Sequence, residues 1–217
     1  MAAGRASTDL RWFLVALAVA VLSLLVVAQA RRPQAPPIAS ASVVDPAALT
    51  PAPDGRIRLP AARAFAVTTP AGSTERITGL LAVPERMRFG DFRWDETGVA
   101  PGRVWVRVDL DRQLLSVFRS GQEIGTAVIL YGANDTPTPT GWLTVLAKAR
   151  DHYSRTYDAP MPYMLRLTAD GVALHASFVR EGRATHGCIG LPYAFAARLF
   201  DAMQVGDRVL VVGTHPA

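Results

Sequence analysis

The 217 residues contain a single cysteine, Cys188, so the chain forms no internal disulfide and cannot build a cysteine-rich zinc site. Charged residues are also sparse, at 19%, while half of the residues are hydrophobic, and this balance excludes a disordered chain. Residues 57–217 carry 18 basic and 15 acidic side chains, and this net charge of +3 is too small to predict nucleic-acid binding. We therefore expect a globular domain whose chemistry centres on Cys188.

Charge is absent from residues 12–28, a run of seventeen residues with arginines on both sides. This length is the lower limit for a membrane span, and Ala28-Gln29-Ala30 has the form of a signal-peptidase site, so an anchor and a cleaved signal peptide compete. We favour the anchor, because Arg31, Arg32 and Pro33 are unfavourable directly after a cleavage point. A buried core helix is a third alternative, but such a helix would show polar residues every three or four positions.

The anchor and the signal peptide both export the rest of the chain. With an anchor, residues 1–11 lie in the cytoplasm and the remainder lies outside the cytoplasmic membrane, in the periplasm or an equivalent compartment. Residues 29–56 are rich in proline and alanine and predict an extended spacer. Residues 57–102 show two weak strand patterns, at 64–69 and 77–83, and are expected to pack as an accessory segment on the domain that follows, 103–213.

Apolar residues alternate clearly from Val104 onward, which predicts strands and hairpins. The only convincing helix begins after Pro192 and runs to about Met203. The chain therefore predicts a mainly β domain with one helix near the C-terminus. The expected strands cover 104–109, 115–118, 124–131, 142–147, 165–167, 172–176 and 208–212.

The segment Thr185-His186-Gly187-Cys188 holds the candidate chemistry. In an extended chain, residues two apart share a face, so His186 and Cys188 would bring an imidazole beside a thiol. Such an imidazole can take the thiol proton and stabilise the thiolate, which predicts an apparent thiol pKa below the free value near 8.5. Gly187 lets the backbone bend so that its N–H and that of Cys188 form an oxyanion hole.

His175 lies on a strand upstream, between the small residues Ala173 and Ser177, which leaves room for a substrate that His175 would orient. A zinc site made of His175, His186 and Cys188 is the alternative. Near these residues the only carboxylate is Glu181, so the ligand set would be incomplete. We therefore expect neither a metal nor a cofactor.

The ordered set of His175, the segment 182–188 and the Thr138-Pro139-Thr140-Gly141 loop resembles the L,D-transpeptidase (YkuD-type) catalytic domain family. The segment 159–163 is similar to the pocket wall of one subgroup, and the resemblance spans about residues 103–213. It implies a β-sandwich, Cys188 as nucleophile and His186 as base. His175, Thr185, Arg183 and Tyr163 would then contact the substrate.

One departure from the family pattern concerns Gly190, where members usually carry arginine or asparagine. If that side chain normally meets a substrate carboxylate, Arg180 or Arg183 would replace it here. The sequence places Gly190 in a loop between the motif and the helix, so we expect Gly190→Arg to be tolerated.

The resemblance implies attack by Cys188 on a peptidoglycan stem peptide, a thioester acyl-enzyme, and 3→3 cross-links in cell-wall biogenesis. Carbapenems would acylate the same thiol. A hydrolase of the same fold, a carboxypeptidase or endopeptidase, is one alternative, and a degenerate peptidoglycan-binding module is another. Because the aliphatic residues outside 12–28 alternate as buried strands do, we expect residues 57–217 to be a soluble monomer.

Overall fold

The computed structural model describes residues 51–60, 64–133 and 135–214. The predicted membrane segment and most of the Pro/Ala-rich spacer lie outside these ranges. Among the residues described, the model contains no helix with the length and apolar character needed to cross a membrane.

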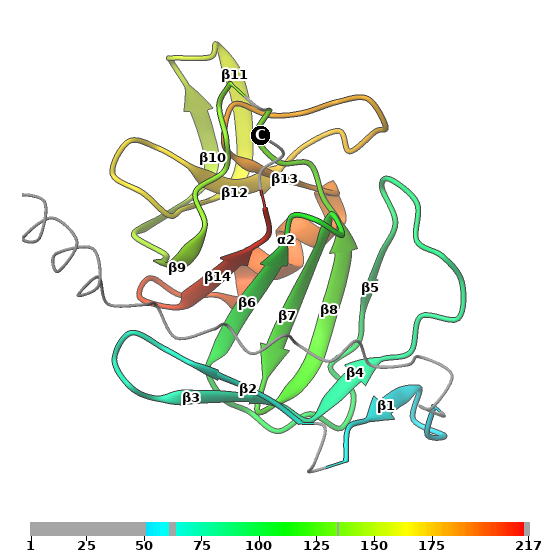
Figure 1. Cartoon of the computed structure of the whole chain (residues 1–217). Helices are drawn as coiled ribbons and strands as arrows, with labels where there is room; N and C mark the ends of the chain where they lie inside the picture. Colours follow the sequence, from blue (N-terminus) through cyan, green and yellow to red (C-terminus); the bar gives the residue numbers. More distant parts are fainter. Residues whose placement is uncertain (1–50, 61–63, 134, 215–217) are drawn as a thin grey trace, which may run out of the picture. The chain divides into compact units, whose positions relative to one another are not determined.

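Three sheets and one helix make up the described part of the chain, as Figure 1 shows. This confirms the mainly β class and the single helix near the C-terminus. The eight-stranded sheet runs β1 (Arg56–Arg58), β4 (Gly79–Leu81), β8 (Gln122–Val128), β7 (Leu114–Arg119), β6 (Val104–Asp109), β14 (Arg208–Val212), β9 (Gly141–Thr144), with β5 (Phe92–Trp94) on β8. The four-stranded sheet runs β10 (Ala147–Ser154), β11 (Ala159–Arg166), β12 (Ala173–Ala176), β13 (Ile189–Leu191), and a small hairpin joins β2 (Phe65–Thr68) to β3 (Thr74–Ile77).

Several predicted elements are confirmed. The helix, α2 (Tyr193–Ala202), begins directly after Pro192, and β14 has the predicted bounds. The β6–β7 hairpin and the pairing of β11 with β12 are also present. Strand β10 was not predicted, because its exposed face and its charged residues hide any apolar period. In Figure 1 the β10–β11 hairpin extends to the top of the view.

The main core lies between the two larger sheets and α2. It joins Val106 of β6, Leu174 of β12, Ile189 of β13 and Phe195 of α2, all at 0% exposure. Burying a side chain of this size contributes about 1.5–3 kcal/mol. Because Leu174 and Ile189 point into this core, the residues beside them on β12 and β13 must point to the opposite face. That opposite face carries the candidate site.

The segment before residue 103 contributes strands to the main sheet. The buried Arg56 guanidinium donates hydrogen bonds to the carbonyl oxygens of Glu123 and Asp95, the latter at 2.6 Å. The Glu123 side chain in turn accepts the Leu81 N–H at 2.9 Å. These bonds join β1 and β4 to β8, so a chain that begins at residue 57 loses the arginine that holds this edge.

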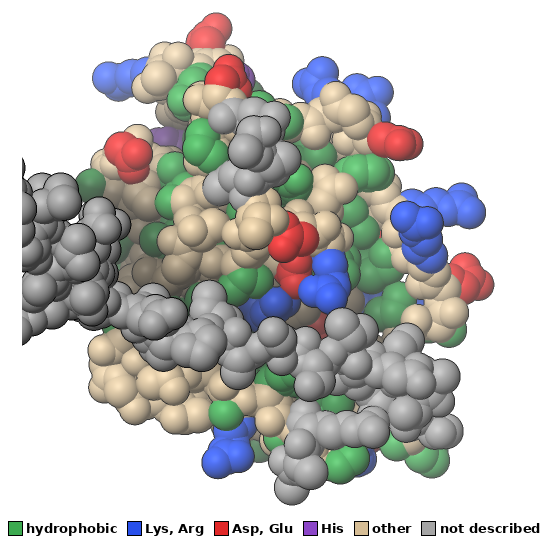
Figure 2. Space-filling model, in the orientation of Figure 1, with side chains coloured by type: hydrophobic (Ala, Val, Ile, Leu, Met, Phe, Trp, Pro, Cys, Tyr) green, Lys and Arg blue, Asp and Glu red, His purple; other side chains and the backbone are tan. Residues whose placement is uncertain are grey.

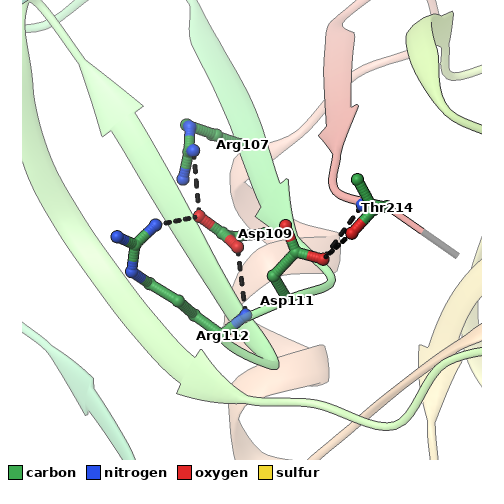
Figure 3. Close-up of polar contacts among 5 residues, drawn as sticks. All are labelled: Arg107, Asp109, Asp111, Arg112 and Thr214. Atoms are coloured by element: carbon green, nitrogen blue, oxygen red, sulfur yellow. Dashed lines mark hydrogen bonds and ion pairs between the residues drawn. The ribbon is translucent and has the colours of Figure 1, made fainter. Parts of the chain in front are cut away.

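The turn between β6 and β7 is fixed by two aspartates (Figure 3). Asp109 accepts hydrogen bonds from the guanidinium groups of Arg107, at 2.9 Å, and Arg112, at 3.0 Å. Burial alone would raise the pKa of Asp109, but the Arg112 N–H and the Arg107 charge bring it below its ordinary value. Asp111 accepts two bonds from Thr214, which ties this turn to the end of β14.

Burial raises the pKa of Glu123 to about 6, and bonds from Ser116 and Leu81 offset only part of this effect. The folded-state pKa therefore lies above the unfolded value near 4.5. The folded state then binds more protons in this interval, so we predict that stability falls by up to about 2 kcal/mol in all as pH rises from below 4.5 to above 6. Glu123→Gln should remove this loss. Urea unfolding of both proteins at pH 4.5 and 7 measures it, and an equal pH dependence in the variant would refute the assignment.

Candidate active site

Parallel pairing of β12 with β13 brings the predicted site residues together. Leu174 pairs with Ile189 and His175 pairs with Gly190, so Cys188 lies one residue before the paired stretch, beside Ala173. Cys188 and Ala173 share one apolar cluster, apart from the main core. If this register is continued by one residue, Cys188 lies diagonally across from His175.

A single hydrogen bond fixes the His175 ring. Its Nδ1 lies 2.8 Å from the carbonyl oxygen of Ala176. A carbonyl can only accept, so Nδ1 carries the proton and Nε2 keeps a free lone pair. Burial lowers the pKa of His175 below its ordinary value of 6.5, and nearby His152 lowers it further, although the bond to Ala176 works against this. At neutral pH His175 is therefore an uncharged base.

The Cys188 side chain is 9% exposed and its Sγ lies 4.0 Å from the carbonyl oxygen of Gly171. Burial raises the pKa of the thiol, Asp170 raises it further, and a hydrogen bond with the Ala173 backbone offsets only part. The expectation of a lowered thiol pKa is therefore wrong in direction. With a raised thiol pKa and a lowered His175 pKa, the resting pair is a neutral thiol and a neutral imidazole.

The segment 185–188 is not extended, which removes the premise that placed His186 beside Cys188. Gly187 has φ +98°, a left-handed conformation, and regular strand geometry begins only at Ile189. His186 is exposed and stacks on the ring of Tyr157 in the β10–β11 turn, with ring centroids 4.6 Å apart. His186 therefore contacts the turn between β10 and β11.

Thr185 fixes the turn that carries the thiol. Its hydroxyl donates to the carbonyl oxygen of Cys188, and its N–H donates to the carbonyl oxygen of Tyr131 at 2.9 Å. Its own carbonyl accepts the N–H of Ala133 at 3.0 Å. The structure therefore gives Thr185 a role in holding the backbone around Cys188.

The other predicted substrate contacts are spread over different places. Tyr163 packs edge-on against Tyr193 and Phe200 of α2, at 5.3 and 5.9 Å, with the main core rather than with the cysteine cluster. Arg180 lies over the exposed ring of Phe178 at 4.3 Å. Arg183 lines a hollow beside the 131–135 loop.

Sequence reasoning missed the residues that surround the thiol. Met161 and Met164 of β11 form the cluster with Ala173 and Cys188, and the Gly171 carbonyl approaches the sulfur. The β11 segment was noticed as a pocket wall, but no sequence signal identified which of its residues face the thiol. In the described part of the chain, no three His, Cys, Asp or Glu residues are grouped so as to hold a metal ion.

The expectation that Gly190 lies in a loop is wrong. Gly190 lies in β13, is buried, and pairs with His175. A Cβ at this position would lie 2.9 Å from the Cβ of Ser177 and 3.4 Å from that of Leu130. Its φ is not in the left-handed region, so glycine is needed here for close packing between strands rather than for backbone conformation.

Comparison with known proteins gives one family. Residues 103–211 match the L,D-transpeptidase catalytic domain model named YkuD. L,D-transpeptidase 1 of Mycobacterium tuberculosis is 35% identical over 115 residues, which cover 45% of this chain and 46% of that protein. The match therefore spans about half the length of the curated relative.

One solved structure agrees with that match, and a second is given for comparison. An L,D-transpeptidase from Stackebrandtia nassauensis has a TM-score of 0.50 and 28% identity, covering 54% of this chain and 58% of its own. The LD transpeptidase LdtMt1 in complex with imipenem is also 28% identical, with a TM-score of 0.47, and covers 50% of this chain and 58% of its own.

We predict that Gly190→Ala lowers the free energy of unfolding by about 1–3 kcal/mol, because the added methyl group overpacks the contact with Ser177. Gly190→Arg should cost more. Ser177→Gly in the same chain should restore part of the loss from Gly190→Ala, which a double-mutant cycle by urea unfolding measures. Full stability of Gly190→Arg would show that the strands separate more readily than the structure indicates.

Proposed function

The chain belongs to the YkuD family of L,D-transpeptidase catalytic domains, and we propose that it is a cysteine acyltransferase that acts on peptidoglycan stem peptides. The observation that carries this proposal is the register of β12 on β13, which pairs His175 with Gly190 and places Cys188 beside Ala173, two residues before His175. A nucleophile, a base with a fixed tautomer and a turn that can present backbone N–H groups are the parts that acyl transfer needs.

His175 is the better candidate for the base, in preference to His186. Its neighbouring position, its Nδ1 bond to Ala176 and its lowered pKa all support a neutral imidazole with Nε2 available to the thiol. The ring of His186 instead stacks on Tyr157, in the turn between β10 and β11. A neutral pair transfers its proton during the attack, so catalysis requires no preformed thiolate.

The proposed reaction proceeds in two steps. Cys188 Sγ attacks the carbonyl carbon of the donor peptide bond, and its proton passes to His175 Nε2. The C–N bond then breaks, the proton moves to the leaving amine, and a thioester remains. The amine of a second stem attacks this thioester, gives its proton to His175, and the proton returns to the sulfur as the C–S bond breaks.

Backbone N–H groups would stabilise the oxyanion formed in each step. The left-handed conformation of Gly187 turns the chain just before Cys188, which supports the proposal that the N–H groups of Gly187 and Cys188 converge on the reacting carbonyl. Thr185 holds this turn through the Cys188 carbonyl. Its effect on the reaction would then be to keep these donors in place.

The product we propose is a 3→3 cross-link in the cell wall, formed outside the cytoplasmic membrane with residues 12–28 as anchor. The exported location follows from the apolar run in the sequence. It agrees with the proposed substrate, because peptidoglycan lies on that side of the membrane.

Imipenem tests the nucleophile. We predict that the protein gains the mass of one imipenem, retained on the peptide that contains Cys188, and that Cys188→Ser gains none, because a buried hydroxyl beside this base is a much weaker nucleophile. Intact-mass and peptide-mass measurements give the result. An adduct of equal yield in Cys188→Ser would exclude this residue as the acylation site.

The pH dependence of imipenem acylation tests which of the two histidines is the base. We predict that the rate falls on the acid side with an apparent pKa below 6.5, because protonation of His175 removes the base. His175→Ala should lower the acylation rate at pH 7 by about 10²-fold or more. His186→Ala should keep the decrease in rate at acid pH. Loss of the acid-side decrease in His186→Ala alone would instead identify His186 as the base.

Alkylation by iodoacetamide reports the thiol itself. Because burial raises the pKa of Cys188, we predict an alkylation profile with an apparent pKa at or above about 8.5, the free-thiol value. Rates across pH 5 to 10 measure it. A midpoint well below 8.5 would instead indicate a stabilised thiolate and contradict the neutral pair.

A further inference from the structure

Strands β10 and β11 turn more side chains toward the thiol than regular alternation allows. Met161 and Met164 of β11 both lie in the cluster with Cys188, although residues three apart on a regular strand point to opposite faces. Ala149 of β10 packs against the same cluster. The register pairs Ala149 with Met164 and His152 with Met161, and directly paired residues share a face. His152 therefore faces the cysteine cluster from β10.

A left-handed residue between the two methionines accounts for this arrangement. Tyr163 has φ +55°, which is uncommon for an aromatic residue, and neither Tyr163 nor Arg150 opposite it belongs to the paired register of the hairpin. The Arg150 guanidinium lies 5.3 Å from the centre of the Tyr163 ring and donates a hydrogen bond to Asp201 of α2 at 3.0 Å. The helix thus contacts the hairpin at the residue that resets its alternation.

The His152 ring has no partner that would explain its position. The ring is half-buried, and its charge acts on His175, whose pKa it lowers. Within the ranges that the structure describes, the ring has neither a hydrogen bond nor an ion pair. The ring of His175, by contrast, is bonded to the carbonyl oxygen of Ala176. The N–H of His152 is therefore available to a ligand beside the reactive pair.

The surroundings of the thiol differ in polarity from one end of β11 to the other. In the described part of the chain, Asp170 is the one carboxylate whose charge acts on the Cys188 thiol. Asp170 lies in the turn after β11, whereas His152 pairs with Met161 near the start of that strand. A substrate carboxylate is repelled at the Asp170 end and can accept a hydrogen bond at the His152 end. This polarity favours one direction for a bound peptide.

The two arginines considered for a substrate carboxylate lie elsewhere. Arg180 packs on the exposed ring of Phe178 at 4.3 Å. Arg183 and Gly132 line a hollow of about 530 Å³, which we call the Arg183 hollow. A Cβ on Gly132 would lie 2.9 Å from the Cα of Gly187, so a backbone wall separates this hollow from the thiol. Neither guanidinium is therefore placed beside the thiol.

We propose that His152 is a specificity-determining residue for the donor, and that its ring N–H binds the free carboxylate of the residue that leaves when Cys188 is acylated. In a donor cleaved before its last residue, that carboxylate lies roughly 3–5 Å from the attacked carbonyl carbon. The Cβ of His152 lies about 5 Å from that of Met161, which packs with the thiol, so the ring can reach a group at this distance. This proposal rests on the proposed function, because a leaving residue exists only if Cys188 attacks such a peptide.

Two donors that differ only in the terminal group test this assignment. The full chain is given a stem tetrapeptide that ends in D-alanine, or the same peptide with a C-terminal amide, and the release of D-alanine or D-alaninamide is measured by mass spectrometry. This release reports acylation whether an amine or water then resolves the thioester. The variants are His152→Ala and His152→Gln, with Arg180→Gln and Arg183→Gln as controls. The ratio of the two kcat/KM values is compared between proteins.

His152→Ala should lower the preference for the free acid over the amide by about tenfold, as expected for the loss of one charge-assisted hydrogen bond. His152→Gln keeps an N–H donor and should retain part of the preference. Arg180→Gln and Arg183→Gln each remove a positive charge and should keep the preference. An unchanged ratio in His152→Ala, an equal loss in either arginine variant, or an equal fall for both donors in His152→Ala would overturn the proposal, the last because it indicates a purely structural role.

Binding to full-length Cys188→Ser separates this proposal from the reaction. The free-acid peptide should shift the ring proton resonances of His152, and the amide should shift them less. If the wild type released neither product and formed no imipenem adduct while these shifts were present, the proposed function would fail and the carboxylate site would stand. Absence of the shifts at millimolar free acid would reject the His152 site whatever the reaction.

Discussion

The parallel pairing of β12 with β13 is the constraint on which the site depends. This register puts Leu174 and Ile189 in the core and leaves His175 and Cys188 on the other face. A slip by one residue would turn the thiol into the core and the isoleucine toward the substrate. The site is therefore fixed by the same apolar residues that stabilise the domain. The close approach of Gly190 to Ser177 adds a second restriction, because it sets how near Ser177 and Leu130 can come to β13.

Burial then determines how the pair can react. In water an imidazole and a thiol would each titrate near their ordinary values, but both groups are largely removed from solvent, and burial disfavours the charged form of each. The carbonyl of Ala176 compensates by fixing the tautomer, which leaves Nε2 ready to accept a proton. Such a pair is neutral at rest, and a neutral thiol reacts more slowly than a thiolate with small oxidants.

Sequence patterns predicted most of the elements but only part of the site. The alternation of apolar residues in β6 and the proline before α2 are local sequence signals. Both elements could therefore be predicted without knowledge of the rest of the fold. The motif around Cys188 was equally recognisable. Its backbone conformation was not, because Gly187 is left-handed and breaks the extended geometry in which His186 and Cys188 would share a face. Met161 and Met164 come from β11, across a sheet whose register no sequence pattern shows.

The contacts of individual charged residues are even harder to predict from the sequence. Arg180 and Arg183 lie three residues apart in one loop, and nothing in the chain distinguishes them. The structure does, since one packs on Phe178 and the other faces Asp135 across a hollow. In Figure 2 the face on view intersperses acidic and basic side chains, so the overall charge gives no guide to an individual contact.

The Gly187 turn lies between two other segments of the chain, and both restrict its conformation. On one side Cys188 packs with Met161 and Met164 of β11. On the other side Gly132 separates the turn from the Arg183 hollow. A bulkier residue at 132 would clash with backbone atoms of Thr136, Thr138 and Gly187 and push the two walls apart. The glycine at 132 therefore lets the 131–133 segment pack directly against the turn that carries Cys188, so the position of the thiol depends on a close backbone contact as well as on the strand register.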